Sequence, residues 1–380
     1  MLRLYIKKIK KLNRLFWAHI ITPVLLLLTF PTRAYRQKSF EKTCPPNTVL
    51  ISFFGRGLGD SIYLAGHLKK IRLRFPQSKI QLAILEQLEP YFRGNPFIDE
   101  ILPCPDFYDG PAACFRFYQS ALKLRNRGSV DLLLNLSPTL AMTPVFWDFL
   151  MAKRYSIGIG DSLKRLFYDQ PVSIDWTKHY YLSIQNGLRQ LGIHETTPSF
   201  WIPPDADLQN LKELERATVS KCILVAPGGR RSIEAPKEYC WNYEGFTKVI
   251  HELLALGHQV IVTGAPYDRE LAEKIEPHPL MINLVGKTTL FQIFTITKKF
   301  ARLVVCNNSG LLHIASVLKI PSVSYADPKE NMLRWGVYPD NGKHVFLQDS
   351  IDRKVTAEEF VRTIQRKLSI AETTNAAAQS

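Results

Sequence analysis

Residues 301–315 read ARLVVCNNSGLLHIA, and this stretch decides the fold class. The apolar, β-branched run from Ala301 to Val305 is typical of a buried strand, and the apolar spacing after residue 310 is typical of a helix. In the turn between them, Asn308 or Ser309 can cap the helix and Gly310 permits a close approach. The first N–H groups of a helix attract negative charge, so the turn predicts an anion-binding site. An ordinary strand-to-helix turn is the alternative.

The same alternation of strand and helix patterns extends over most of the chain, which predicts parallel sheets covered by helices. In the first half, strands are expected at residues 48–54, 79–85, 98–102, 130–136 and 154–159, and helices at 62–75 and 108–127. In the second half, strands are expected at 221–226, 259–264, 281–284 and 301–305, and helices at 243–256, 265–274, 291–298 and 360–368. Residues 161–205 are expected to form an irregular linker. In this linker a lone histidine among aromatic residues, His179, is interpreted as a packing residue, with a position facing the cleft as the alternative. The predicted fold class is α/β.

The composition sets broad limits on the class of protein. A chain of 380 residues with 46% hydrophobic and 22% charged residues is long enough for two globular domains. The six cysteines show neither C-x-x-C spacing nor histidines at metal-ligand spacing, which indicates free thiols in a reducing compartment. No metal site is expected.

The positive charge is concentrated at the N-terminus. The chain carries a formal net charge of +15, of which residues 1–42 hold +9 and the other 338 residues hold +6. This distribution argues against nucleic acid as a partner, because such a partner requires basic residues over a folded face. The apolar segment 15–30 is shorter than the ~20 residues of a spanning helix and lacks a clear cleavage site. We expect residues 1–43 to form an arm that associates with an anionic membrane surface; a spanning anchor or a signal sequence is the alternative.

A glycine-rich turn, GRGLGDS at residues 55–61, follows the first expected strand. The third glycine of a dinucleotide-binding fingerprint would fall at position 60, where the chain has Asp60, so an NAD(P)-dependent enzyme is disfavoured. A carboxylate at the carboxyl end of a strand can deprotonate a substrate hydroxyl, and Gly57 and Gly59 let the substrate approach. The alternative role for Asp60 is a helix N-cap.

A second glycine-rich turn, PGGRR at residues 227–231, follows the strand expected at 221–226. Gly228 and Gly229 expose backbone N–H donors, and Arg230 and Arg231 can each hold a phosphate through two hydrogen bonds. The pattern predicts a diphosphate site, with a tight turn carrying solvated arginines as the alternative. The sequence GKT at 286–288 lacks the preceding glycine of a Walker loop and is not interpreted as one.

Taken in order, these motifs resemble glycosyltransferase family 9, the heptosyltransferases that build the lipopolysaccharide inner core. The resemblance extends over about residues 48–330 and is carried by the Gly-Asp turn at 57–60, PGG at 227–229, Trp241, Glu244, Phe246, VTG at 262–264, NLVGKTTL at 283–290, NSGLLHIA at 308–315 and Pro321. It implies a GT-B architecture, with two facing Rossmann-like domains and a cleft between them. It also implies that the acceptor binds the first domain and a nucleotide-diphosphate sugar binds the second.

The resemblance also implies roles for residues. Asp60 matches the general base of the family, and Ser309-Gly310 and the PGGRR turn match the diphosphate cradle that replaces a metal ion, with His313 one helical turn further on. The family usually has Asp where this chain has Asn308. It also tends to have Lys two residues before Trp241, where this chain has a tyrosine, so Lys237 or the arginine pair has to supply the positive charge.

The leading hypothesis is an inverting, metal-independent glycosyltransferase without a cofactor, which moves heptose from ADP-heptose to a lipid-linked saccharide such as the lipopolysaccharide core. It would act at the cytoplasmic face of the bacterial inner membrane. A membrane-tethered nucleotide-sugar-binding protein without transfer activity is the alternative. The expected domains are the arm at 1–43, an acceptor-side domain with linker at 44–205, a nucleotide-sugar domain at 206–345, and a C-terminal helix with a disordered tail at 346–380.

Overall fold

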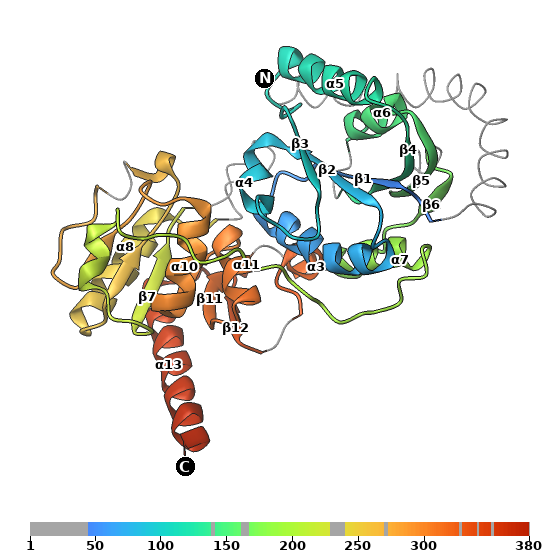
Figure 1. Cartoon of the computed structure of the whole chain (residues 1–380). Coiled ribbons are helices and arrows are strands. Elements are labelled where there is room, and N and C mark those ends of the chain that lie inside the picture. The colour runs from blue at the N-terminus through green and yellow to red at the C-terminus, as the bar shows by residue number, and fades with distance from the viewer. Residues whose placement is uncertain are drawn as a thin grey trace. The chain divides into compact units, whose positions relative to one another are not determined.

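The computed structural model describes residues 45–137, 141–160, 167–228, 240–269, 273–326, 329–339, 342–350 and 353–379. In this part the chain forms two compact α/β units, each built on a six-stranded parallel sheet (Figure 1). The first unit holds the chain up to Arg56 and residues 64–176 and 180–199; the second holds residues 57–63, 177–179 and 200–380. The predicted α/β fold class is confirmed.

The first sheet has the strand order β3-β2-β1-β4-β5-β6, and all neighbouring strands are parallel. Its strands are β1 (Thr48–Phe53), β2 (Lys79–Leu85), β3 (Glu100–Cys104), β4 (Val130–Asn135), β5 (Lys153–Ile159) and β6 (Gln170–Val172). The central strands are buried on both faces because helices cover both, which explains their continuous apolar runs.

The helices of the first unit are residues 64–74 of α3 (Leu58–Arg74), whose start belongs to the second unit, and α4 (Glu89–Phe92), α5 (Pro111–Arg125), α6 (Thr143–Leu150) and α7 (Tyr180–Arg189). Figure 1 shows α5 and α6 on one side of the sheet and α3 and α7 on the other. On the first side, Phe117 and Trp147 pack around Phe54 at ring-centroid distances of 4.9 and 5.1 Å. This aromatic cluster fixes both helices to the sheet.

The second sheet repeats the topology, with the order β12-β11-β10-β7-β8-β9 and parallel neighbours throughout. Its strands are β7 (Cys222–Ala226), β8 (Val260–Val262), β9 (Met281–Asn283), β10 (Ala301–Asn307), β11 (Ser322–Tyr325) and β12 (His344–Leu347). In both sheets the first and fourth strands in chain order lie side by side at the centre. The chain therefore reverses its direction of travel across each sheet between these two strands.

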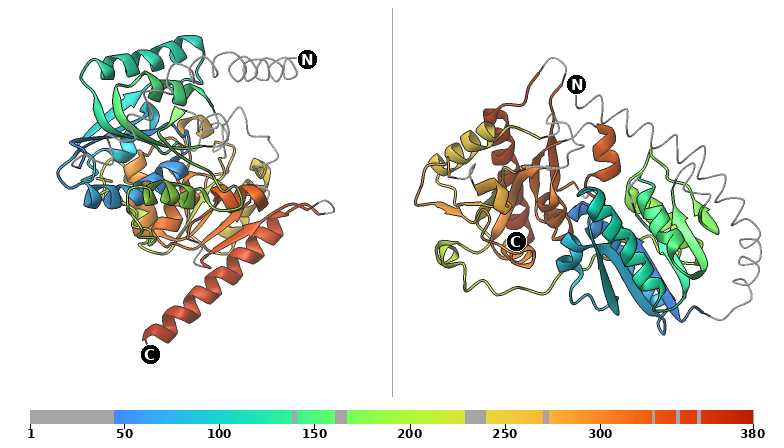
Figure 2. Two further views of the ribbon diagram at one scale, coloured as in Figure 1. Left: turned by 90° about the vertical axis from the view of Figure 1, so that its right-hand side faces the viewer. Right: turned by 90° about the horizontal axis from the view of Figure 1, so that it is seen from above.

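The helices of the second unit are α8 (Tyr243–Ala255), α10 (Leu290–Phe300), α11 (Gly310–Val317), α12 (Lys329–Trp335) and α13 (Ala357–Gln379). Residues of α8 and α13 share one core with alternate residues of β7 and β10. Trp241 lies in this core, where its ring stacks on Phe360 at 4.5 Å and its Nε1 donates to the carbonyl of Val355 at 3.2 Å. The start of α13 is thereby tied to the segment that precedes α8 (Figure 2).

Three regions differ from the sequence-based prediction. The segment expected to be an irregular linker contains β6 and α7, because Tyr180, Tyr181, Ile184 and Leu188 recur at helical spacing and form a buried face that the sequence analysis did not recognise. The helix expected at 265–274 appears as a 3₁₀ turn at Pro266–Asp268, and residues 270–272 lie outside the described part. The tail expected to be disordered continues α13 to Gln379, since it contains three consecutive alanines.

Candidate functional site

The candidate site lies at the carboxyl ends of β7 and β10 in the second unit. In open parallel sheets, ligands bind outside the carboxyl ends of the strands where the chain reverses direction across the sheet. Here β7 ends before Pro227 and Gly228, and β10 ends at Asn307 before α11 begins. The sheet thus brings together two motifs that are about 80 residues apart in the chain.

Asn307 connects the two strand ends. Its side chain is buried, its Nδ2 donates to the carbonyl of Pro227 at 3.1 Å, and its Oδ1 accepts from the backbone N–H of Trp241 at 2.8 Å. The sequence analysis did not select Asn307, because it stands beside Asn308 and nothing local distinguishes the two. Its role is to hold the turn after β7 in place.

The start of α11 has no side-chain cap. Ser309 occupies the N-cap position with extended backbone, φ −138° and ψ 175°, but its hydroxyl does not bond the helix N–H groups. The hydroxyl is buried and makes no hydrogen bond of normal geometry with a described residue, although it lies near enough to the Cys306 thiol to offset part of the rise that burial causes in the pKa of that thiol. Asn308 is also buried. Ser309 therefore occupies the predicted cap position but does not cap the helix through its side chain. Its hydroxyl and the N–H groups of the first turn of α11 are the kind of donors that an anion-binding site needs.

The first turn of α3 packs directly on the first turn of α11, and glycines on both helices make the contact possible. A Cβ on Gly59 would lie 2.5 Å from Nε2 of His313, and a Cβ on Gly310 would lie 2.9 Å from Cδ2 of Leu58. Neither position accepts a larger residue without displacement of its neighbour. The two glycine motifs that the sequence analysis treated separately therefore form one interface within the second unit.

Asp60 lies in this interface, in the first turn of α3. Its half-buried carboxylate folds back over Gly57, where a Cβ would lie 2.8 Å from Oδ2. Because α3 begins at Leu58, Asp60 is the third residue of the helix, so the alternative role of N-cap is wrong. The Asp60 carboxylate thus packs against Gly57, and His313 packs against Gly59, two residues further along the chain.

Tyr63 orients His313. The Tyr63 hydroxyl donates to the carbonyl of Gly336 and lies 3.0 Å from Nδ1 of His313. Burial and the charge of Asp60 raise the pKa of Tyr63 well above its usual value, so the hydroxyl keeps its proton. Because the Tyr63 hydroxyl donates its hydrogen to the carbonyl of Gly336, a hydrogen bond between Tyr63 and Nδ1 of His313 requires the proton on Nδ1. In a neutral ring the lone pair is then on Nε2.

His179 completes this buried network. Its Nε2 lies 3.1 Å from the same carbonyl of Gly336, and its ring stacks on Tyr338 with a centroid distance of 5.0 Å. Burial lowers the pKa of His179 to about 4, so the ring is neutral at pH 7 and donates through Nε2. The expectation of a packing residue is confirmed.

Tyr63 and Gly336 were missed by the sequence analysis because they lie far from His313 in sequence and show no local pattern.

Asp268 is a further residue that the sequence analysis missed. A Cβ on Gly228 would lie 2.5 Å from its Oδ2, and a Cβ on Gly264 would lie 2.9 Å from the same atom. This oxygen also accepts from the backbone N–H of Ala265 at 2.9 Å. Asp268 therefore packs against the turns after β7 and β8. The space that Asp268 takes is a second reason why position 228 requires a glycine, besides the exposure of its N–H group.

Four predicted donor-binding residues, Gly229, Arg230, Arg231 and Lys237, lie outside the described residues and stay predictions. In the part of the chain that is described, no three His, Cys, Asp or Glu side chains converge as a metal site would require. Among the same residues, no helix is long and apolar enough to cross a membrane.

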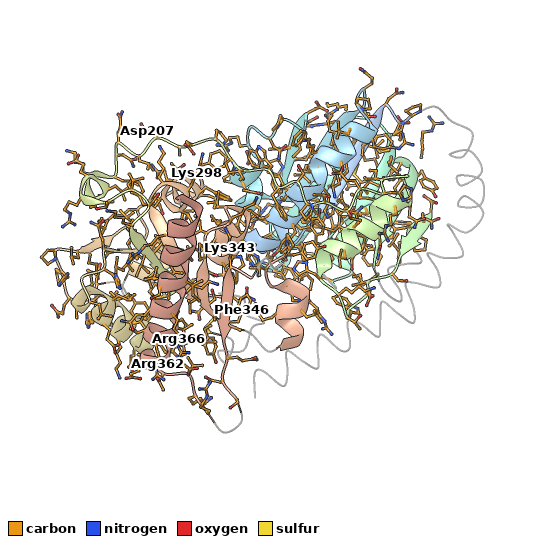
Figure 3. All side chains as sticks on the ribbon, turned by 90° about the horizontal axis from the view of Figure 1, so that it is seen from below. Asp207, Lys298, Lys343, Phe346, Arg362 and Arg366 are labelled. Carbon is orange, nitrogen blue, oxygen red and sulfur yellow. The ribbon has the colours of Figure 1, made fainter. Side chains whose placement is uncertain are left out.

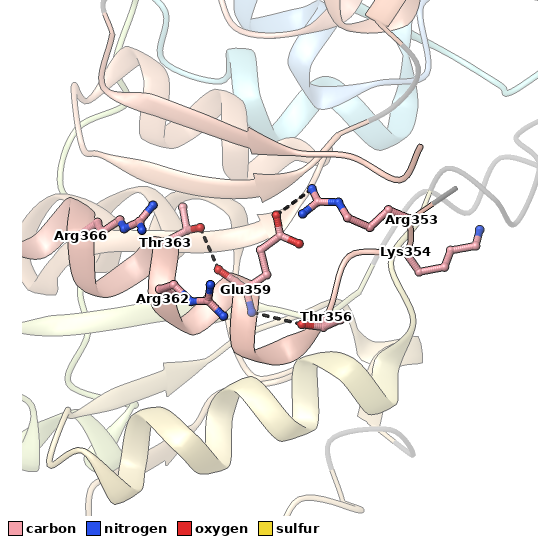
Figure 4. Close-up of a pocket in the computed structure, with 7 residues that line it drawn as sticks. All are labelled: Arg353, Lys354, Thr356, Glu359, Arg362, Thr363 and Arg366. Carbon is pink, nitrogen blue, oxygen red and sulfur yellow. Dashed lines mark hydrogen bonds and ion pairs between the residues drawn. The ribbon is translucent and has the colours of Figure 1, made fainter. Parts of the chain in front are cut away.

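A groove of about 390 Å³ on α13 is separate from this site (Figure 4). It is lined by Arg353, Lys354, Thr356, Glu359, Arg362, Thr363 and Arg366. Arg353 pairs with Glu359 at 3.0 Å and Lys354 pairs with Asp349 at 2.9 Å, while Arg362 and Arg366 project from the helix (Figure 3). Because carboxylates offset much of its charge, the groove resembles an ordinary solvated helix face.

Comparison with known proteins places this geometry in a family. Residues 123–361 match glycosyltransferase family 9 (heptosyltransferase). Lipopolysaccharide heptosyltransferase 3 of Escherichia coli is 22% identical over 304 residues, which cover 74% of this chain and 84% of that protein. Lipooligosaccharide heptosyltransferase 2 of Haemophilus influenzae is 21% identical over 291 residues, covering 71% and 81%.

Solved structures show the same fold. A glycosyl transferase family 9 protein from Veillonella parvula superposes with a TM-score of 0.68 at 21% identity, covering 85% of this chain and 97% of that one. The E. coli ADP-heptose lipopolysaccharide heptosyltransferase II gives a TM-score of 0.65 at 16% identity, covering 86% and 99%. The predicted GT-B architecture is confirmed.

Proposed function

The chain belongs to glycosyltransferase family 9, the heptosyltransferases, and we propose that it transfers heptose from ADP-heptose to a lipid-linked saccharide of the lipopolysaccharide core. The observation that carries this proposal is the packing of the Asp60 carboxylate against Gly57 and of His313 against Gly59, beside the uncapped start of α11. A carboxylate next to an anion-attracting helix start suits the transfer of a sugar from a diphosphate to a hydroxyl. The names of the relatives support the choice of donor and acceptor.

The reaction we propose is a single displacement that inverts the anomeric carbon. Asp60 accepts the proton of the acceptor hydroxyl, and the oxygen attacks the anomeric carbon from the face opposite the diphosphate. The bond from the anomeric carbon to the diphosphate oxygen breaks as the new C–O bond forms. The departing ADP takes the electron pair of the broken bond.

The departing diphosphate gains negative charge, and the start of α11 is placed to stabilise it. Backbone N–H groups at a helix start and the Ser309 hydroxyl can donate to phosphate oxygens. We include Arg230, Arg231 and Lys237 in this role as a prediction from the sequence, since a guanidinium binds phosphate through two hydrogen bonds. With these donors, the proposal requires neither a metal ion nor another cofactor.

His313 binds the donor through Nε2 in this scheme, and Tyr63 acts as a positioning residue. The hydrogen bond from Nδ1 to Tyr63 fixes the ring and directs Nε2 toward Gly59 and the start of α3. Nε2 of the neutral ring can accept from a hydroxyl of the donor. A Tyr63→Phe variant should therefore weaken donor binding and raise KM more than it lowers kcat.

The acceptor determines where the protein has to act. A lipid-linked saccharide lies in a membrane, and we propose that residues 1–43, with their net charge of +9, hold the enzyme at the anionic cytoplasmic face of the bacterial inner membrane. This arm lies outside the described residues. The alternative of a nucleotide-sugar binder without transfer activity gains no support, because a binder has no use for Asp60.

The proposal is tested by measuring ADP release from ADP-heptose with a lipid-linked core saccharide as acceptor, alongside other nucleotide sugars. We expect turnover with ADP-heptose. We also expect NMR of the product to show an anomeric configuration opposite to that of the donor. Turnover with a different nucleotide sugar alone would change the assigned donor. Retention of configuration would exclude the single displacement, and binding without turnover would favour the alternative function.

A further inference from the structure

Helix α5 of the first unit exposes apolar residues where a soluble helix face is normally polar. Its buried face is formed by Ala113, Phe117, Ala121 and Leu124. Phe115 and Leu122 are 63% and 44% exposed. At 100° per residue these two side chains lie within about 20° of each other and roughly opposite the buried face. The helix therefore carries an outward apolar ridge that the described residues of its unit leave exposed.

Basic residues flank this ridge. Arg116 and Lys123 are exposed on one side of it and Arg125 is exposed on the other. None of the three forms an ion pair with a described residue, and α5 contains no acidic residue. The acids just before the helix, Asp106 and Asp109, pair with Arg56 at 2.7 and 3.5 Å. The face thus combines apolar side chains at its centre with positive charge at its edges.

We propose that this face of α5, defined by Phe115, Arg116, Leu122, Lys123 and Arg125, docks on an anionic lipid surface. The apolar ridge inserts among the acyl chains near the headgroups, and the flanking cations contact lipid phosphates. Charge complementarity favours an anionic lipid surface, and it disfavours a second copy of this chain because three cations without acidic neighbours repel the same face of another copy. Figure 1 shows α5 along the outer side of its unit, with α6 beside it.

The inference extends the proposed function, because a lipid-linked acceptor is met at a membrane surface. It adds a contact that is distinct from residues 1–43, which the sequence analysis had assigned to the membrane. Vesicle binding is measured without donor or acceptor. Its failure therefore leaves the proposed transfer reaction intact, and failure of transfer leaves the docking face intact.

The experiment titrates the full chain with vesicles of phosphatidylethanolamine and phosphatidylglycerol, and with vesicles of phosphatidylcholine. We expect Phe115→Gln with Leu122→Gln to lower the partition coefficient on anionic vesicles by about tenfold or more. Arg116→Gln with Lys123→Gln should lower it by about tenfold on anionic vesicles and leave binding to phosphatidylcholine unchanged. All four side chains are exposed, so both variants should keep the parent's melting temperature.

Matched controls come from the second unit. Val219 and Leu256 are 63% and 49% exposed, so Val219→Gln with Leu256→Gln removes similar apolar exposure elsewhere. Arg362→Gln with Arg366→Gln removes two positive charges from α13. We expect both controls to bind vesicles like the parent. If the α5 variants bind like the parent, or the controls lose binding equally, the docking face is wrong.

A footprint of the parent locates the contact without substitutions. Acetylation of lysines followed by mass spectrometry should show protection of Lys123 by anionic vesicles and no protection of Lys354, whose side chain is 84% exposed. Unprotected Lys123 contradicts the inference. A dimer in lipid-free buffer that dissociates on Phe115→Gln with Leu122→Gln would assign the face to a second copy instead.

Discussion

The fourth strand of each sheet ends in a similar sequence but in a different environment. β4 and β10 both lie beside the first strand of their sheet, and each ends in an asparagine that is followed two residues later by a serine. In the first unit, Ser137 Oγ accepts from Phe54 N–H at 2.9 Å and donates to the carbonyl of Ser52 at 3.3 Å. In the second, no described residue bonds the buried hydroxyl of Ser309.

The asparagines differ in the same sense. Asn135 donates to Asp148, which also accepts from the Tyr168 hydroxyl at 2.7 Å, so side chains fill the space near the end of β4. Asn307 instead bonds the backbone groups of Pro227 and Trp241. The two sheets share one topology, but side chains satisfy the polar groups at the end of β4, whereas the Ser309 hydroxyl after β10 keeps a hydrogen-bond donor for a ligand. From this difference we propose that the end of β4 has a structural role and that the end of β10 binds the sugar donor.

The largest contrast is expected between two carboxylates. Asp60→Asn removes the proposed base and should lower kcat by about 10²- to 10⁴-fold. Asp148 is fully buried and burial raises its pKa, so Asp148→Asn should change the melting temperature and leave transfer largely intact. Stopped ADP-release assays and thermal melts of the purified variants measure both effects. An active Asp60→Asn protein with a parent-like melt removes Asp60 from catalysis.

The two units should both lose stability in mild acid through buried histidines. His67 lies in the first unit, and burial followed by the charge of Lys70 lowers its pKa well below the usual value; burial lowers the pKa of His179 in the second to about 4. Each folded-state pKa lies below that of the unfolded chain, so the unfolded state binds protons first. The free energy of unfolding should fall by about 1.4 kcal/mol per pH unit for each histidine below pH 6.5.

This histidine effect can be measured by urea unfolding between pH 7 and pH 5. His67→Phe keeps an aromatic ring stacked against Tyr181 and removes one titrating group, so the slope with pH should become shallower. An unchanged slope would mean that His67 is already protonated in the folded protein.

Substitutions at two closely packed glycines, Gly59 and Gly158, distinguish an effect on packing alone from an effect on donor binding. A Cβ on Gly59 would overlap the ring of His313, whereas a Cβ on Gly158 would overlap the ring of Tyr168 in the first unit. Each Gly→Ala change should cost about 1–3 kcal/mol in stability, because a closely packed ring has to move. Gly59→Ala should also weaken ADP binding in calorimetry, and Gly158→Ala should not. Equal ADP affinities in the two variants would contradict the placement of His313 in the donor site.

The serine pair gives the smallest and most specific contrast. Ser137→Ala leaves the buried N–H of Phe54 without its acceptor and should lower the free energy of unfolding by about 1–3 kcal/mol without loss of ADP affinity. Ser309→Ala removes a hydroxyl that bonds no described residue, so stability should be unchanged while ADP affinity falls by about 5- to 10-fold. The reverse pattern would exchange the roles of the two strand ends.

Local patterns explain what the sequence could predict. The strands β2 and β7 appear almost where their apolar, β-branched runs indicate, and α8 begins and ends within one residue of the expected range. The glycines at 59 and 310 were recognised as positions of close approach, although the neighbours that require them, His313 and Leu58, could not be identified. A glycine in a motif indicates that another group packs closely at that position, and the three-dimensional structure is needed to identify that group.

The rest of the site depends on contacts between distant parts of the chain. Tyr63 and His313 are 250 residues apart, and Tyr63 and Gly336 are 273 residues apart, so no spacing or period relates them. The similar ends of β4 and β10 could not be distinguished for the same reason, because their difference lies in the neighbouring segments. The arginine pair after Gly229 was predicted from chemistry and awaits a direct test.

The central claim is that nucleotide diphosphate binds at the end of β10 and the start of α11, and not at the equivalent end of β4. Amide hydrogen exchange with and without ADP, read by mass spectrometry, tests it directly on the unmodified chain. We predict slower exchange at residues 308–313 on addition of ADP and unchanged exchange at residues 135–137. Protection at residues 135–137, or no protection at residues 308–313 at saturating ADP, would contradict the claim.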